Sequence, residues 1–226
     1  MIKDFVSRIS DLTSARGLLI PLDVALVGAT GVGKSSTINS LFGNESAIVG
    51  SGVDPETKII SSYKSDEYFR VHDTPGLGDG INEDIRYAQE LSVLLSKKIS
   101  IKNSEKLFGY IDITLVILDG SSRDLGTTYH VLENIVLRCI EHDRVIVAIN
   151  QADQAMKGRH WDVVENKPDS ILLTFLEEKC LSIQKRIDES IGLKISKPVF
   201  YSAYHNYNID TLMNHILEHL PYHRRS

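Results

Sequence analysis

The sequence predicts an α/β fold, a three-layer sandwich in which helices cover both faces of a mainly parallel sheet of about six strands. Short apolar runs such as ITLVIL and VIVAI alternate with longer segments of helical period. The apolar runs are continuous and rich in β-branched residues, which is typical of strands that are buried on both faces of a parallel sheet. In such sheets, ligands bind at the carboxyl ends of the strands.

The first twenty residues predict an amphipathic helix that precedes the domain. Apolar side chains recur there at helical spacing, and Pro21 ends the pattern. The apolar stripe consists of Phe5, Ile9, Leu12 and Ala15. We therefore expect a helix within residues 1–20, the domain over residues 21–222 and a short tail at residues 223–226.

The remaining elements follow from the same patterns. Apolar or alternating runs predict strands at residues 24–28, 57–64, 67–73, 111–119, 144–150 and 198–202. Helical periodicity predicts helices at residues 35–42, 84–99, 128–142, 170–191 and 209–220. The glycine-rich residues 74–82 predict a loop, and the polar residues 151–168 hold the single tryptophan, Trp161.

Composition narrows the class of protein. The 226 residues are 42% hydrophobic and 24% charged, as in an ordinary globular protein. The net charge of −5 argues against a wholesale nucleic-acid binder, which would carry a basic surface. The apolar runs are too short to cross a bilayer, and the N-terminus lacks the pattern of a signal peptide. Two cysteines are too few for a disulfide framework, so we expect a cytoplasmic protein.

A glycine-rich phosphate loop follows the first predicted strand of the domain and opens a predicted helix. The run V-A-L-V-G-A-T-G-V-G-K-S-S contains G-x-x-x-x-G-K-S. Its glycines let backbone N–H groups face phosphates, and the following helix presents its positive end to the same anion. Lys34 adds a cation near the β and γ phosphates, and the Ser35 hydroxyl can ligate Mg²⁺. The predicted nucleotide-binding residues of this loop are Gly28, Ala29, Thr30, Gly31, Val32, Gly33, Lys34, Ser35 and Ser36.

A second motif, D-T-P-G, follows the predicted strand at residues 67–73. Asp73 is placed to hold a water molecule bound to Mg²⁺, and Gly76 offers a backbone N–H to the γ-phosphate. Such a turn is common by itself, because proline and glycine favour turns. It gains weight from its position at the end of a strand, after the phosphate loop.

Two further segments favour guanine over adenine. Asn150, Gln151 and Asp153 lie in N-Q-A-D directly after a strand, and Ser202 and Ala203 follow P-V-F-Y. The Asp153 carboxylate can accept hydrogen bonds from both N1–H and the 2-amino group of guanine, and adenine offers neither arrangement. A backbone N–H at Ser202-Ala203 can meet guanine O6. Each segment is uninformative alone, but all of them occur in order at the ends of predicted strands.

With these motifs, residues 22–220 resemble the translation-factor-related GTPases. G-V-G-K-S-S-T-I-N-S-L-F-G followed by D-T-P-G-L-G-D is most similar to the Era/septin-like branch, which includes prophage-type, Toc, immunity-associated and interferon-inducible GTPases. The resemblance implies a Ras-like G domain that binds GTP or GDP together with Mg²⁺. By the same resemblance, Ser35, Thr57 and Asp73 would hold the Mg²⁺ ion. The resemblance also implies that Lys34, Thr57 and Gly76 act on the γ-phosphate. Thr57 would be the switch I threonine, although Thr30, Ser51 and Ser61 are other nearby hydroxyls.

The sequence departs from the family pattern at two positions. Gln151 stands where the family has a lysine whose stem covers one face of the base, so we expect weaker guanine binding with the same preference. Leu77 stands where Ras-like proteins carry a glutamine that orients the attacking water, so we expect slow hydrolysis. Asp79, Asn82 and Arg86 are nearby polar residues without support as a replacement.

Three functions compete. The first is a GTP-dependent switch that a protein effector reads. The second is a module whose dimerisation or scaffolding is controlled by GTP, with a nucleotide-dependent homodimer. The third, an ATP-using phosphotransferase, is disfavoured because the chain shows no arginine-rich lid.

Two polar clusters are interpreted as ordinary surface. Residues 154–168, with Lys157, Arg159, His160 and Trp161, predict an exposed loop rather than a nucleic-acid contact. His215 and His219 are one helical turn apart, but we expect a solvated helix face rather than a metal site.

Overall fold

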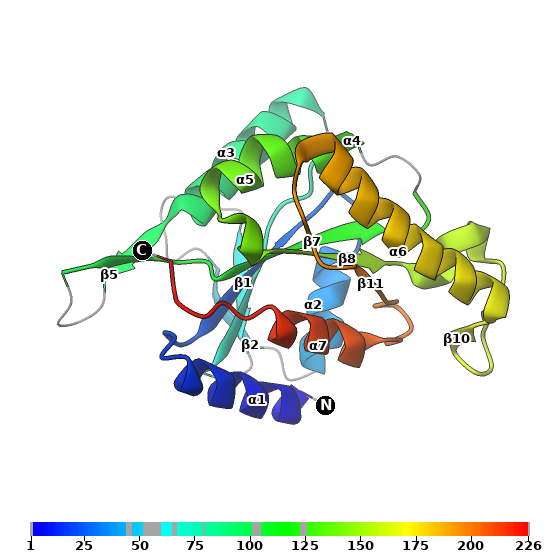
Figure 1. Cartoon of the computed structure of the whole chain (residues 1–226), viewed down its shortest axis with the longest axis horizontal. Coiled ribbons are helices and arrows are strands. Elements are labelled where there is room, and N and C mark those ends of the chain that lie inside the picture. Colours follow the sequence, from blue (N-terminus) through cyan, green and yellow to red (C-terminus); the bar gives the residue numbers. More distant parts are fainter. Residues whose placement is uncertain are drawn as a thin grey trace.

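A seven-stranded sheet forms the centre of the protein (Figure 1). The structure, a computed structural model, describes residues 2–43, 47–51, 60–64, 67–78, 80–100, 105–122 and 126–225. The strand order is β11-β8-β7-β1-β4-β3-β2. The first five strands in this order pair in parallel, and β3 and β2 continue the sheet antiparallel. The strands are β1 (Leu22–Val27), β2 (Ala47–Ser51), β3 (Ser61–Lys64), β4 (Phe69–Asp73), β7 (Ile113–Asp119), β8 (Val145–Asn150) and β11 (Val199–Phe200).

Helices cover both faces of this sheet, which confirms the predicted fold class (Figure 1). One face carries α1 (Ile2–Ala15), α2 (Lys34–Phe42) and α7 (Ile209–Glu218), and the other carries α3 (Ile81–Ser96), α4 (Gly126–Val131), α5 (Leu137–Cys139) and α6 (Ser170–Ile191). Alternation along β1 explains the two layers, because successive side chains of a strand point to opposite faces. Ala25 and Val27 belong to the core under α3 and α6, whereas Val24 and Leu26 belong to the core under α1 and α7.

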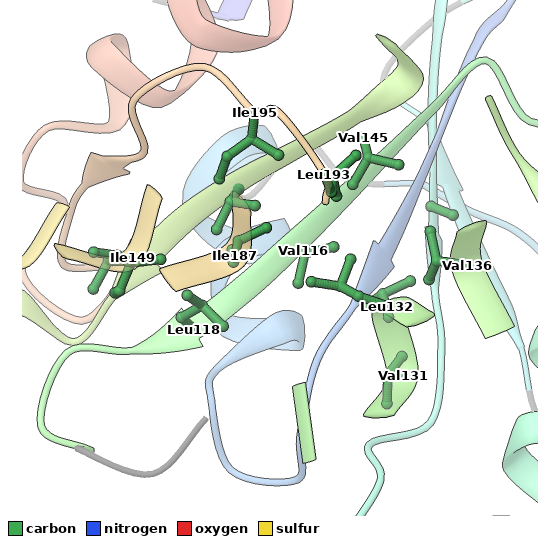
Figure 2. Close-up of a cluster of buried hydrophobic side chains, with 14 of the residues drawn as sticks. Val116, Leu118, Val131, Leu132, Val136, Val145, Ile149, Ile187, Leu193 and Ile195 are labelled. Carbon is green, nitrogen blue, oxygen red and sulfur yellow. The ribbon is translucent and has the colours of Figure 1, made fainter. Parts of the chain in front are cut away.

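Figure 2 draws part of the core under α3 and α6, where side chains of β7 and β8 lie together with Val131, Leu132 and Ile187 of the helices on that face. Val116 and Leu118 of β7 lie in one cluster with Leu132 and with Ile187 of α6, and all four are buried. Burying side chains of this size stabilises the fold by about 1.5–3 kcal/mol each relative to exposure.

Some elements differ from the sequence-based expectation. Strand β2 was not predicted, and the helix expected to reach residue 99 ends at Ser96. Lys97 has extended backbone angles (φ −57°, ψ 137°), and β5 (Lys98–Ser100) pairs antiparallel with β6 (Leu107–Gly109). Ile99 fits the helical period but is used in this hairpin. The single helix expected at residues 128–142 consists of α4, a π-helix at Leu132–Val136, and α5. A widened turn of this kind cannot be read from apolar spacing.

The polar residues 151–168 also contain local structure. They form 3₁₀ turns within Ala152–Gly158, interrupted by a kink at Ala155, and a short hairpin of β9 (Trp161–Asp162) and β10 (Lys167–Pro168). Another 3₁₀ turn, His142–Arg144, precedes β8. The ring of Trp161 packs 5.3 Å from that of Tyr207, in an edge-to-face arrangement.

The N-terminal helix and the last residues both pack onto the domain. In α1, Phe5 and Ile9 are buried as expected, whereas Ala15 is exposed and the helix ends there rather than at Pro21. Arg224 and Arg225, in the segment expected to be a tail, are buried, and the Arg224 guanidinium contacts Asp23 of β1.

The prediction that His215 lies on a solvated face of the last helix is wrong, because His215 is only 4% exposed. Its position on α7 faces the sheet, because α7 packs against β11 with its apolar side. In the described part of the chain, no helix has the length and apolar character needed to span a membrane.

Candidate nucleotide-binding site

The phosphate loop connects the end of β1 to the start of α2, as the sequence predicts. Gly31 (φ +80°) and Gly33 (φ +87°) take backbone angles that side chains rarely adopt. The ammonium group of Lys34 donates hydrogen bonds to the carbonyls of Gly28 and Ala29, both at 3.1 Å. Lys34 is 8% exposed, so its charge is held against the concave side of the loop. The loop therefore offers a fixed cation together with the N-terminus of α2.

The residues that follow β4 lie directly on this loop. The N–H of Thr30 donates to the carbonyl of Leu77 at 2.9 Å, and Ala29 and Leu77 form an isolated parallel bridge. A Cβ at Gly76 would lie 2.5 Å from Cα of Thr30, so only glycine permits this close approach. The D-T-P-G segment and the phosphate loop are thus in direct backbone contact.

A hydroxyl and a carboxylate that suit a hard divalent cation meet at the start of α2. The Oγ atom of Ser35 donates to Oδ2 of Asp73 at 2.7 Å. Burial raises the pKa of Asp73, against the hydrogen bond from Ser35 and the charge of Lys34, which lower it. Oxygen ligands of this kind are those that Mg²⁺ selects, and a cation there would offset the cost of burying the carboxylate. The residues present therefore fit Mg²⁺. Thr57 and Asp79 lie outside the described residues.

These groups line a pocket of about 490 Å³ on the phosphate side. Its lining is formed by Thr30, Gly31, Gly33, Lys34, Ser35, Ser36, Ser61, Asp73, Thr74, Pro75, Gly76 and Tyr87. Ser61 was named only as another hydroxyl near Thr57, and Tyr87 was not predicted as a member, because neither belongs to a motif. They reach the pocket from β3 and α3.

A second pocket, of about 330 Å³, adjoins the first and shares Gly33 and Ser36 with it. The rest of its lining is Asn150, Gln151, Asp153, Gln154, Ala203 and Tyr204. Together the two pockets bring residues of the phosphate loop, the β4 end, the β8 end and the β11 end into one continuous cleft. This is the arrangement that the order of the motifs predicted.

Asp153 is 4% exposed and is fixed by neighbours on both carboxylate oxygens. The hydroxyl of Ser202 donates to Oδ1 at 2.6 Å, and the side-chain amide of Gln154 donates to Oδ2 at 2.6 Å. Each oxygen of an ionised carboxylate can accept more than one hydrogen bond. Asp153 is therefore held in one orientation and can still accept hydrogen bonds from a ligand. Ser202 itself is fully buried and does not line the pocket.

Asn150 and Gln151 connect the base-side loop to the phosphate loop. The Nδ2 atom of Asn150 donates to the carbonyl of Val32 at 2.9 Å, and its Oδ1 atom accepts from the N–H of Ala203 at 3.0 Å. The side-chain amide of Gln151 donates to the carbonyl of Gly31 at 2.7 Å. Sequence reasoning assigned both residues to the nucleotide, which stays a prediction. Both line the base-side pocket, and their side-chain amides also connect its loop to the phosphate loop.

Leu77 and Tyr204 complete the description of the cleft. Leu77 is 4% exposed and packs in the core under α3 and α6. Tyr204 is 85% exposed at the rim of the base-side pocket. Sequence reasoning missed Tyr204, although its position directly after Ser202-Ala203 was a signal that could have found it.

Comparison with known proteins identifies the family. A family model described as 50S ribosome-binding GTPase matches residues 23–151, more than half of the chain. The chain belongs to this GTPase family. The matched residues run from β1 through the phosphate loop and the D-T-P-G segment to Gln151. The sequence-based resemblance to the translation-factor-related GTPases is confirmed, and with it the binding of guanine nucleotide.

Curated members of related GTPase groups are similar over much of the chain. GTPase Der of Prochlorococcus marinus is 25% identical over 206 residues, which cover 89% of this chain and 38% of that protein. The tRNA modification GTPase MnmE of Alkaliphilus oremlandii is 30% identical over 138 residues, which cover 60% of this chain and 26% of that protein. The chain thus spans well under half the length of these GTPases.

Solved structures share the fold. Era of Aquifex aeolicus bound to GDP and AlF₄⁻ superposes with a TM-score of 0.51 at 21% identity, covering 88% of this chain and 56% of that one. Era in complex with MgGDPNP and part of 16S ribosomal RNA superposes with a TM-score of 0.53 at 19% identity. This match also covers 88% of this chain and 56% of that one. The absence of a nucleic-acid partner, expected from the charge of this GTPase-family chain, stays a prediction.

Proposed function

We propose that this GTPase domain is a Mg²⁺-dependent switch that binds GTP, hydrolyses it slowly and reports the bound nucleotide through the segment after β4. The single observation that carries the proposal is the hydrogen bond from Thr30 N–H to the Leu77 carbonyl at 2.9 Å. It joins the phosphate loop to the segment that must respond to the γ-phosphate. Any ligand that changes this contact changes the position of residues 76–77.

In this proposal the cleft divides the nucleotide between its two pockets. Lys34 and the backbone N–H groups at the start of α2 neutralise the phosphates, and Asp153 accepts hydrogen bonds from N1–H and the 2-amino group of guanine. Ser35 and Asp73 would hold Mg²⁺, which supplies charge neutralisation at the phosphates when it is bound. Thr57 remains our proposal for the switch I ligand.

The switch follows from competition at the rim of the phosphate loop. The Thr30 N–H faces the Leu77 carbonyl, and a γ-phosphate approaching the same rim would attract the N–H groups of Thr30 and Gly76. A phosphate oxygen is a stronger acceptor than a carbonyl, because hydrogen bonds to charged acceptors are about twice as strong. GTP would therefore replace this backbone contact, and hydrolysis would restore it.

Slow hydrolysis follows from the place of the Leu77 side chain. It is packed among apolar side chains of the core, and an aliphatic group cannot orient a water molecule for attack. Rate acceleration is then limited to positioning and charge neutralisation. We expect that a partner or a second copy of the chain supplies the missing group.

The alternative output is GTP-controlled dimerisation, and one observation favours keeping it. Ile81 and Ile85 of α3 are 81% and 55% exposed, and they line an apolar groove together with Leu77. This groove changes shape if Leu77 moves, so a protein effector or a second copy could read the switch there. Light scattering with GDP and with a non-hydrolysable GTP analogue separates the two, because only dimerisation doubles the mass in the absence of other proteins.

We also propose a cytoplasmic location. Cys139 and Cys180 are free thiols in the structure, which suits a reducing compartment.

The experiment that tests the proposal is a calorimetric titration with GDP, ADP and xanthosine diphosphate, each with Mg²⁺. Wild type should prefer GDP strongly over ADP. Asp153→Asn should lose GDP affinity and gain affinity for the xanthosine nucleotide, because its amide can donate to the 2-carbonyl of xanthine. Ser202→Ala is the matched control, since it removes the support of Asp153 and leaves the base contact. Ser202→Ala should lower the affinity for GDP modestly without changing the preference for GDP over the other two nucleotides.

Equal binding of GDP and ADP by wild type, unaffected by either variant, would refute the guanine pocket. Phosphate release from GTP, measured with and without Mg²⁺, tests the hydrolysis. Release that does not depend on Mg²⁺ would contradict the role given to Ser35 and Asp73.

A further inference from the structure

Three side chains with metal-binding atoms gather at the C-terminal end of α7. His215, Glu218 and His219 each offer a nitrogen or oxygen atom, and these three atoms lie within 4.8 Å of one another. The residues are spaced at i, i+3 and i+4, so the helix itself brings them to one side. Two imidazoles and a carboxylate form a donor set that zinc uses in proteins.

His219 is held in the tautomer that a metal ligand requires. Its Nδ1 atom lies 2.7 Å from the carbonyl oxygen of His215. A carbonyl oxygen only accepts hydrogen bonds, so Nδ1 carries the hydrogen when the ring is neutral. The lone pair is then on Nε2. Histidines that ligate metals commonly donate their other ring N–H to a backbone carbonyl in this way, which fixes the ring and raises its basicity.

His215 brings a buried ring with an unsatisfied nitrogen. The residue is 4% exposed, and its Nε2 atom is buried with no hydrogen-bond partner among the described residues. This buried nitrogen is therefore available to a cation. The two imidazole rings lie 4.6 Å apart between their centres.

Glu218 gives this cluster a negative charge and access from solvent. Its side chain is exposed, and that of His219 is half-buried. In a tetrahedral zinc site the ligand atoms are about 3.3 Å apart, from metal–ligand distances of about 2.0 Å. The exposed Glu218 side chain can change its rotamer to shorten this distance, while His215 is held by its burial and His219 by its hydrogen bond.

We propose that His215, Glu218 and His219 form a site for a divalent transition-metal ion of the zinc class, separate from the Mg²⁺ site of the nucleotide cleft. With three protein ligands from one helix, a fourth position is left for water. The ion would fasten the last turn of α7, directly before the segment that carries Arg224 and Arg225 into the domain. The site depends on no feature of the nucleotide cleft.

The test uses the full chain, stripped with a chelator and saturated with Mg²⁺ and GDP to occupy the nucleotide cleft. Zinc alone is titrated by calorimetry, and cobalt(II) is added separately to record its visible absorption bands. We compare wild type with His219→Gln and Glu218→Gln, both at accessible positions where substitution leaves the core intact. His142→Ala is the matched control, because His142 is an exposed histidine of a different element.

Wild type should bind one zinc ion and unfold at a higher temperature with zinc present, since the ion binds only the folded chain. His219→Gln should weaken zinc binding by about tenfold or more and should lose the cobalt bands of low-coordinate geometry. Glu218→Gln should weaken binding less, and His142→Ala should match wild type. No zinc uptake by the folded wild type, or equal uptake by His219→Gln and wild type, would overturn the site. A loss with His142→Ala as large as that with His219→Gln would also overturn it.

Discussion

Asn150 is the residue whose removal should most clearly uncouple the two halves of the cleft. Asn150→Ala deletes two hydrogen bonds, one to the carbonyl of Val32 and one from the N–H of Ala203. Asn150 is 2% exposed, so both backbone groups stay buried when their partner is lost. Each buried unsatisfied group costs about 1–3 kcal/mol. The free energy of unfolding should therefore fall by about 2–6 kcal/mol, at the lower end if water enters the space.

The assay is urea unfolding of the nucleotide-free chain, followed by calorimetric titration with GDP. The slope of the transition should be unchanged while the midpoint falls. The affinity for GDP should also fall, because Asn150 no longer connects the phosphate loop to the backbone of Ala203. Asn134→Ala is the control, since Asn134 makes its hydrogen bonds at the exposed surface of the domain and such changes stay within about 0.5 kcal/mol. If Asn150→Ala were no more destabilising than Asn134→Ala, the coupling described here would be wrong.

Two further predictions follow from single side chains. Tyr204→Ala should lower the affinity for GDP by about tenfold, because aromatic stacking on a base contributes ~1–3 kcal/mol. Tyr204→Phe keeps the ring and should bind GDP like wild type. Calorimetry measures both variants, and equal losses of affinity would rule out stacking. Burial raises the pKa of Asp112 to about 7, although Arg224 lowers it. The folded chain then binds this proton more tightly than the unfolded chain, so stability falls as the pH rises from about 4 to 7, by about 1.4 kcal/mol per unit. The free energy of unfolding, measured at pH 5 and at pH 7.5, should fall between these two values in wild type and not in Asp112→Asn. An equal fall in both proteins would contradict the role given to Asp112.

The sequence was sufficient for the cleft as a whole because its signals are local. A phosphate loop, D-T-P-G and N-Q-A-D each follow an apolar run, and the carboxyl ends of parallel strands meet at one edge of a sheet. Pro198 to Tyr201 gave a weaker signal, yet β11 forms beside β8 and brings Ala203 to Asn150. The order of the motifs thus predicted the neighbours correctly.

What the sequence did not predict depends on contacts between distant segments. Asn150 and Gln151 match a nucleotide motif, but their side-chain amides also donate to carbonyls of the phosphate loop that are more than a hundred positions away. The burial of His215 is decided by how α7 lies on the sheet, and helical spacing alone could not separate this from a solvated face. Tyr204 belongs to no motif, and only the shape of the pocket shows its position.

The contact of the last residues with Asp23 of β1 is another one between distant segments, at the end of the sheet opposite the nucleotide cleft. Asp23 is fully buried in β1, and an uncompensated buried carboxylate would cost several kcal/mol. It accepts hydrogen bonds from Arg70, His72 and Arg224, at 2.5, 2.8 and 3.0 Å. Burial raises the pKa of Asp23, but the hydrogen bonds and charges of His72 and Arg70 outweigh burial and hold this pKa below its usual value.

Two of these donors belong to β4, the strand that ends at Asp73 in the nucleotide cleft. Arg224 is contributed by the C-terminal segment, where it also donates to the carbonyls of Gly109 and Tyr110. The charge of Asp23 is therefore compensated fully only when this segment is in place. For this reason we assign the C-terminal arginines to the folded domain: they complete the buried end of the strand whose other end carries a proposed Mg²⁺ ligand.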